Sequence, residues 1–100
     1  MTVRHEGKSK KFLTEVDGIE AYASYELHYG GLDIRHTRVP RAIGGRGIAA
    51  ALVKAAYDYA LAQNLTPMAT CSYAALWLRR HPEYHGTTSP DYTGGDSCAL

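Results

Sequence analysis

The sequence lacks the long apolar runs and the excess of one charge that mark several classes of protein. No stretch approaches the roughly 18 to 20 consecutive apolar residues of a membrane-spanning helix, and the polar start Met1-Thr2-Val3-Arg4 has no apolar signal core. The 11 Lys and Arg residues nearly cancel the 10 Asp and Glu residues, which disfavours a basic nucleic-acid-binding face. We therefore expect a soluble, cytoplasmic protein with neither a membrane nor a nucleic acid as partner.

Cysteine is also scarce, and the chain is short. Of its 100 residues only Cys71 and Cys98 carry sulfhydryl groups; the first follows an expected strand and the second lies in a polar C-terminal segment. A reducing compartment with two free thiols is the simpler interpretation. The length allows one domain, and 45% apolar residues are enough for it to have a hydrophobic core.

Three segments near the N-terminus alternate between apolar and polar residues and predict a β-meander. We expect strands at 10–17 and 19–28, joined by Asp17-Gly18, because this dipeptide favours a type I′ hairpin turn. A third strand is expected at 32–39, where Pro40 removes a backbone donor.

The second half of the chain predicts a helix, a strand and a shorter helix. Residues 46–64 have a period near 3.6, with a stripe formed by Ile48, Leu52, Ala55, Ala56, Tyr59 and Ala60. A fourth strand follows at 66–71, and Ser72 is a candidate N-cap for a helix through Arg80. A right-handed crossover would place the fourth strand parallel to the third.

The expected fold class is therefore α/β, in the α+β sense: a three-stranded antiparallel meander, a long crossover helix, a fourth strand parallel to the third, and a short C-terminal helix. Residues 1–86 would form the domain. Residues 87–100, which are rich in Gly, Ser, Thr, Pro and Asp, would form a flexible tail.

The most informative segment is the glycine-rich loop at 39–49, between the third strand and the long helix. Glycines let the backbone approach a diphosphate, and the N–H groups of a helix N-terminus can bind its oxygens. Arg46 could add a charged contact. The alternative is that the loop only connects two elements. It lacks the Lys-Ser/Thr of a P-loop and the parallel strands of a dinucleotide fold.

This loop resembles the acetyl-coenzyme A loop of the GNAT superfamily of N-acetyltransferases, whose pattern is Arg/Gln-x-x-Gly-x-Gly/Ala. Gly47 and Ala49 match its last two fixed positions. Gly44 stands where Arg or Gln is usual, so the resemblance implies a diphosphate-binding site that depends on backbone amides.

A more specific resemblance is to the minimal GNAT-like N-acetyltransferase domains of about a hundred residues. It spans roughly residues 8–86 and is carried by His-Thr-Arg-Val-Pro at 36–40, Cys-Ser-Tyr at 71–73 and Arg-His-Pro-Glu-Tyr at 80–84. Arg38 departs from the pattern, because relatives commonly have Glu there. A catalytic base at that position is therefore not expected.

The resemblance implies that coenzyme A lies between the diverging ends of the third and fourth strands. The pantetheine arm would pair with the strand at Thr37 to Val39, and the diphosphate would bind backbone amides of the loop. The implied cofactor-binding residues are Thr37, Val39, Gly44, Gly45, Arg46, Gly47, Ile48 and Ala49.

Three residues are candidates for catalysis, each with a structural alternative. Cys71 could be a nucleophile if its pKa were lowered, or a small buried apolar residue. Tyr73 could protonate the departing thiolate, as a tyrosine does in many GNAT enzymes, or pack on the sheet. His36 is a candidate base, although strand alternation places it on the core face with Leu32 and Ile34.

The function that the resemblance implies is acetyl transfer from acetyl-coenzyme A to an amine, on a small molecule or a protein. No metal is expected: His81 and His85 have ligand-like spacing, but Pro82 interrupts a helix that would align them. Two other functions stay open. One is a coenzyme A binding module without turnover, and the other is a small protein-interaction domain.

Overall fold

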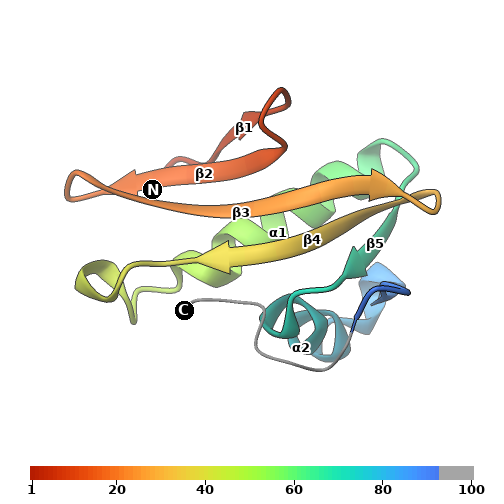
Figure 1. Ribbon diagram of the computed structural model, residues 1–100. Coiled ribbons are helices and arrows are strands. Elements are labelled where there is room, and N and C mark those ends of the chain that lie inside the picture. Colours follow the sequence, from red (N-terminus) through yellow and green to blue (C-terminus); the bar gives the residue numbers. More distant parts are fainter. Residues whose placement is uncertain (93–100) are drawn as a thin grey trace.

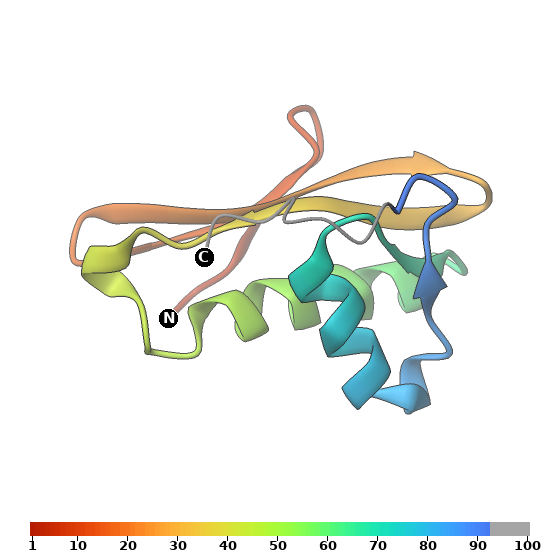
Figure 2. The ribbon, with the colours of Figure 1, turned by 60° about the horizontal axis from the view of Figure 1, so that its bottom comes forward.

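A six-stranded sheet carries two helices on one of its faces, as the computed structural model of the chain shows for residues 1–92 (Figures 1 and 2). The strand order follows the sequence, β1-β2-β3-β4-β5-β6. The elements are β1 Arg4–Glu6, β2 Lys11–Val16, β3 Ile19–His28, β4 Gly31–Arg38, η1 Arg41–Ile43, α1 Ile48–Ala62, β5 Thr66–Ala69, α2 Ser72–Arg80, η2 Pro82–Tyr84 and β6 Thr87–Thr88. Neither α-helix in this part of the chain has the length and apolarity needed to cross a bilayer.

The two predicted hairpins are confirmed by their turns. At the β2–β3 turn, Asp17 and Gly18 have φ values of 53° and 76°, and at the β3–β4 turn Tyr29 and Gly30 have 55° and 72°. Positive φ at both central residues is the signature of a type I′ turn, whose twist matches that of the paired strands. The antiparallel pairing of β2, β3 and β4 follows.

Helix α1 supplies most of the helical part of the core. It packs across β2 to β5, and Leu52, Val53, Ala56 and Tyr57 have no exposed surface. Tyr57 rather than Tyr59 is the fully buried tyrosine, and its hydroxyl donates to the Met68 carbonyl at 2.6 Å. This bond satisfies the one polar atom that the side chain carries into the core.

An irregularity in β4 determines which side chains face the helices. Ser24 pairs with His36 but Tyr25 pairs with Ile34, so Arg35 is an extra residue on β4. A β-bulge of this kind reverses the alternation. Thr37 and Val39 consequently point into the core while His36 is exposed. The expectation that His36 shares the core face with Leu32 and Ile34 is therefore wrong.

Beyond the bulge, β4 and β5 diverge. Their parallel pairing runs from Gly31 and Thr66 to Ile34 and Ala69, whereas β4 stays paired with β3 as far as Arg38. Within residues 1–92, the last part of β4 thus has no strand on its β5 side. The chain leaves this end of β4 for the glycine-rich loop and α1.

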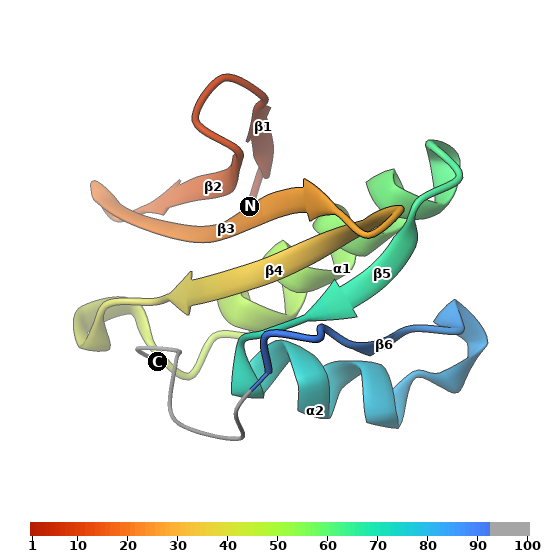
Figure 3. The ribbon, with the colours of Figure 1, turned by 45° about the vertical axis from the view of Figure 1, so that its right-hand side comes forward.

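Two short strands extend the sheet beyond the predicted four (Figure 3). β1 adds to β2, and β6 pairs in parallel with β5. The predicted tail is therefore wrong for residues 87–92: β6 belongs to the sheet, and Ser89 is 4% exposed. Residues 93–100 lie outside the described part of the chain. The α+β fold class, with β5 parallel to β4, is confirmed.

Candidate functional site

A cavity of about 480 Å³ opens where the glycine-rich loop meets α1. This volume is in the range of small-molecule sites. The loop, the end of β4, the first turn of α1 and the start of α2 all contribute to it. Its lining consists of Val39, Arg41, Gly44, Gly45, Gly47, Ile48, Ala49, Ala50 and Tyr73. Six of the eight residues expected to bind a cofactor therefore lie around one cavity.

The first turn of α1 presents backbone donors to this cavity. The N–H of Ala51 donates to the Gly47 carbonyl at 3.1 Å, so the amides of Ile48, Ala49 and Ala50 precede the helical ladder. No side chain caps the helix, and its first turn contains no acidic residue. These amides and the helix dipole favour an anion.

Backbone conformation, rather than packing, requires glycine in the loop. Gly45 and Gly47 have φ values of +74° and +75°, in the left-handed region that glycine adopts without strain. A Cβ built at either position meets no atom within 4 Å. Both glycines therefore border open space from which a ligand can approach the backbone.

The arginine at this cavity is not the one that the sequence indicates. Arg46 Nη1 binds Asp17 Oδ2 at 2.8 Å in an exposed pair, and Arg46 does not line the cavity. Arg41, on the one-turn helix η1, lines it instead. No motif marks Arg41, because a loop's backbone path decides which side chain points into the cavity.

Cys71 and Thr37 meet behind the divergence of β4 and β5. Both are fully buried, with Thr37 Oγ1 and Cys71 Sγ 3.5 Å apart. Cys71 is disulfide-bonded, so the expectation of a free thiol is wrong for this residue. The other cysteine, Cys98, lies outside the described residues. Cys71, not Ser72, is the N-cap of α2, and no side chain donates or accepts a capping hydrogen bond there.

Tyr73 lies in the first turn of α2 and lines the cavity. Burial raises the pKa of its hydroxyl above the ordinary value, and the nearby positive charge of Arg80 opposes this with a smaller effect. The phenol thus keeps its proton at neutral pH and can donate it. His36 lies apart from this cavity, on the exposed side of β4.

Comparisons with known proteins give a family model and several relatives. A model described as GCN5-related N-acetyl-transferase matches residues 11–87. The Protein NATD1 of Xenopus tropicalis is 35% identical over 83 residues, which cover 80% of this chain and 76% of that protein. The human Protein NATD1 is 34% identical over 83 residues, covering 80% and 74%.

A solved structure shows the same arrangement. The NMR solution structure of a GCN5-like protein from Staphylococcus aureus matches with a TM-score of 0.67 and 26% identity, covering 88% of this chain and 87% of the other. The family model spans more than half of the sequence and includes the loop, both helices and four of the six strands completely. The chain therefore belongs to the GCN5-related N-acetyltransferase family.

Proposed function

We propose that this protein binds acetyl-coenzyme A at the glycine-rich loop and transfers the acetyl group to an exposed amine. The observation that carries the proposal is the uncapped first turn of α1, whose amides face a cavity at the end of β4. The residues present fit the diphosphate: backbone donors, the Arg41 side chain and no acidic group in the first turn of α1. Thr37 and Val39 lie on the open β4 edge where the pantetheine would pair.

The acceptor is expected to be exposed rather than enclosed. Larger members of the superfamily carry helices between their first two strands, and these helices shape the acceptor site. Here the first two strands, β1 and β2, are joined only by residues 7–10. A shallow surface of this kind suits a lysine side chain or an N-terminal amine of a partner better than a small molecule.

Acetyl-coenzyme A supplies an activated acetyl thioester for attack by a neutral amine. Tyr73 would hold a proton at its hydroxyl oxygen and donate it to the thiolate that leaves. The attacking amine also loses a proton, and this proton needs an acceptor. The exposed His36 on β4 is our candidate for this base. Together the two proton transfers yield an amide and free coenzyme A.

Cys71 takes no part in this direct route. A disulfide-bonded sulfur has no thiolate with which to attack a thioester. We therefore expect Cys71→Ala to transfer acetyl groups at a rate within about threefold of wild type, with and without reductant. If the alanine variant folds and binds coenzyme A but transfers nothing, a covalent route through Cys71 replaces the direct one.

The proposal is tested by calorimetry and by label transfer. Acetyl-coenzyme A and coenzyme A should bind and raise the melting temperature, while NAD should do neither. Transfer of radiolabelled acetyl groups to a lysine-containing peptide separates an enzyme from a binding module without turnover. Equal stabilisation by NAD, or no binding of coenzyme A, would overturn the cofactor assignment.

A further inference from the structure

The outer face of the sheet, which is the side away from the two helices, carries a row of side chains across four strands. Phe12, Ala23 and Thr37 are buried on the helix side, so strand alternation turns their neighbours to the outer face. The registers align four of these outer residues: Arg4 on β1, Leu13 on β2, Tyr22 on β3 and Arg38 on β4. Figure 1 views this face, with α1 behind β3 and β4. Adjacent strands lie about 4.8 Å apart, so the row is about 14 Å long, with an arginine at each end.

Three cations on the outer face have no acidic partner among residues 1–92. Arg4 and Arg38 are exposed, and Lys11 lies on the same face, two residues before Leu13. None of the three forms an ion pair within this part of the chain. The Lys11 ammonium lies 4.6 Å from the centroid of the Tyr22 ring, a contact that leaves its charge without a counterion. The row therefore offers its positive charge to a partner from outside.

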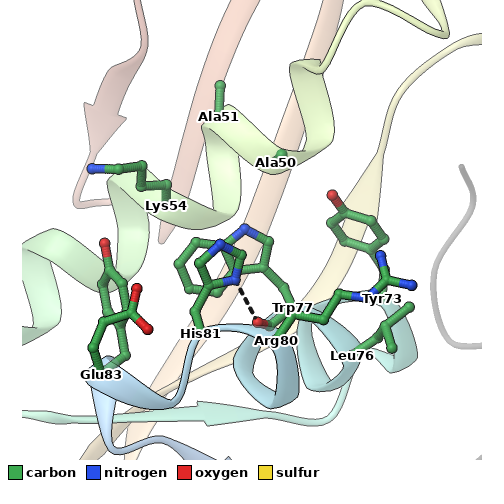
Figure 4. Close-up of a pocket in the computed structure, with 10 residues that line it drawn as sticks. Ala50, Ala51, Lys54, Tyr73, Leu76, Trp77, Arg80, His81 and Glu83 are labelled. Atoms are coloured by element: carbon green, nitrogen blue, oxygen red, sulfur yellow. Dashed lines mark hydrogen bonds between the residues drawn. The ribbon is translucent and has the colours of Figure 1, made fainter.

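The groove between α1 and α2, a cavity of about 410 Å³ on the helix side, offers less to a charged partner (Figure 4). Lys54 Nζ is bound to Asp58 Oδ2 at 2.7 Å. The His81 ring stacks on Trp77 with ring centroids 3.9 Å apart, and its Nδ1 lies 2.8 Å from the Trp77 carbonyl oxygen. The ammonium and the imidazole of this groove thus have partners within the protein, whereas the cations of the outer face do not.

The base that we propose for acetyl transfer lies on the outer face. His36 is exposed, pairs with Ser24 in the register and precedes Arg38 by two residues, so the two side chains point to the same side. An amine that gives its proton to His36 has to approach from this side. The chain that carries the amine then lies over the neighbouring row, within reach of Arg38 and Tyr22.

The cations act on such a chain in two ways. Positive charge near the amine favours its neutral form, which is the form that attacks a thioester. It also attracts acidic side chains on either side of the amine and repels basic ones. Glu15 and Glu20 lie opposite each other on the same face, just beyond the row. A long polyanion that crossed the whole face would meet these two carboxylates, so a short acidic segment fits better than a nucleic acid.

We propose that the outer face of β1 to β4 binds a short acidic protein segment that carries the acceptor amine, with Arg38 and Lys11 as partners of its carboxylates. This inference rests on the proposed function and specifies its acceptor: an amine whose neighbours in sequence are Asp or Glu. The chemistry is unchanged. The amine nitrogen bonds to the acetyl carbon and gives its proton to His36, the thioester C–S bond breaks, and coenzyme A leaves as the thiol.

The test compares acetyl transfer to three peptides, each with one lysine flanked by glutamates, by glutamines or by arginines. Wild type at low salt should show a kcat/KM about tenfold higher for the glutamate peptide than for the glutamine peptide, the combined effect of a few exposed ion pairs. The arginine peptide should be the poorest acceptor. The preference should disappear at about 1 M salt, where the screening length falls to about 3 Å.

Variants assign the preference to the row. Arg38→Gln should lower the ratio of glutamate to glutamine peptide about threefold, and the double variant Lys11→Gln/Arg38→Gln should bring it to near one. Arg79→Gln is the matched control, because it removes the same charge from an exposed position on α2 and should keep the wild-type ratio. Fluorescence anisotropy of the labelled glutamate peptide, with coenzyme A present, measures binding without turnover.

The outcomes separate this inference from the proposed function. Equal kcat/KM for the three peptides, or the same ratio in wild type and the double variant, overturns the acidic acceptor and leaves acetyl transfer in place. Absence of transfer to every peptide overturns the proposed function, and equal binding of the glutamate and glutamine peptides by anisotropy then overturns the surface as well. Binding of a single-stranded oligonucleotide, or self-association, that Arg38→Gln abolishes would give the face a different occupant and overturn the inference.

Discussion

Two polar regions of this small domain differ in how far their hydrogen bonds are completed. The first surrounds Asp33, whose carboxylate is fully buried on β4. It accepts from Thr70 Oγ1 at 3.0 and 2.9 Å and from Arg35 Nη1 at 3.2 Å, and His28 Nε2 lies 2.7 Å away. The second is the first turn of α1. Its backbone donors face a cavity, and no side chain caps them.

The contrast separates a structural cluster from a binding site. His28, Asp33 and Asp91 bring ligand atoms within 4.8 Å of one another, as a metal site would. However, the Arg35 guanidinium already binds both Asp33 and Asp91, so a protein cation takes the place of an ion. The hydrogen-bonded network around Asp33 links β3, β4 and the segment after β5. The uncapped backbone donors of α1, in contrast, remain available to a ligand.

The strongest test of this contrast is the variant Asp33→Ala, which should destabilise the fold if the Asp33 cluster is structural. The variant removes the buried acceptor of the Thr70 hydroxyl and leaves Arg35 with Asp91 as its carboxylate partner, so the free energy of unfolding should fall by about 1–3 kcal/mol. Urea unfolding measures the loss. Glu26→Ala is the control, because it removes an ion pair with Lys10 whose side chains are 46% and 50% exposed, and it should cost about 1 kcal/mol or less. Equal losses in the two variants would contradict a structural role for the Asp33 cluster.

At the binding region, the largest expected effect is on turnover. Tyr73→Phe removes the proton that the departing thiolate needs, so kcat should fall by about 100-fold. The affinity for coenzyme A should change little, because the backbone amides remain. Steady-state kinetics and calorimetry measure the two effects separately. Tyr29→Phe, at an exposed turn residue, should leave both unchanged. Full activity in Tyr73→Phe would assign the proton to another donor.

A smaller effect is expected when a glycine of the loop before α1 is replaced. Gly47→Val should weaken coenzyme A binding by at least about tenfold, because valine strains a backbone at φ +75° and occupies space at the cavity. Gly18→Val is a matched control: Gly18 has φ +76° and equally open surroundings, but it lies in the β2–β3 turn. Both variants should lose similar stability, and only Gly47→Val should lose affinity. Equal affinities in the two folded variants would place the diphosphate elsewhere.

The sequence predicts the parts of this fold that have a regular period. The alternation in β2, β3 and β4 and the helical stripe of α1 extend over several residues, and the predicted elements match the observed ones within a few residues. The strands β1 and β6 have three and two residues, too few for a period to be recognised. They form because a neighbouring strand offers an unpaired edge, which is a property of the folded sheet.

The errors at the site have related physical causes. One extra residue, Arg35, reverses the faces of His36 and Thr37, and nothing in the local composition marks the bulge. Arg46 pairs with Asp17, which is distant in sequence, and Arg41 is the arginine that lines the cavity. The position of the loop follows from the order of elements, whereas the direction of each side chain depends on contacts made after folding.

The smallest effect that we predict concerns the N-terminal strand and extends the comparison to a third polar contact. His5 on β1 stacks on Phe12 with ring centroids 4.2 Å apart, and its Nε2 lies 2.6 Å from the Tyr25 hydroxyl. Burial lowers the pKa of His5 below its ordinary value of 6.5. The folded state therefore favours the neutral ring, and the stabilisation is complete above the unfolded pKa and is lost as pH falls below it.

Thermal unfolding at pH 8 and pH 5 tests this contact. Wild type should lose more stability between these two pH values than His5→Gln, which has no titrating ring at this position. His85→Asn, at an exposed residue with a φ of 53° that asparagine also adopts, should resemble wild type. The difference should be small, because His5 is exposed and water reduces the cost of its charge. If His5→Gln and wild type lose the same stability, the folded protein does not favour the neutral ring, and β1 is held by its pairing with β2 and by stacking alone.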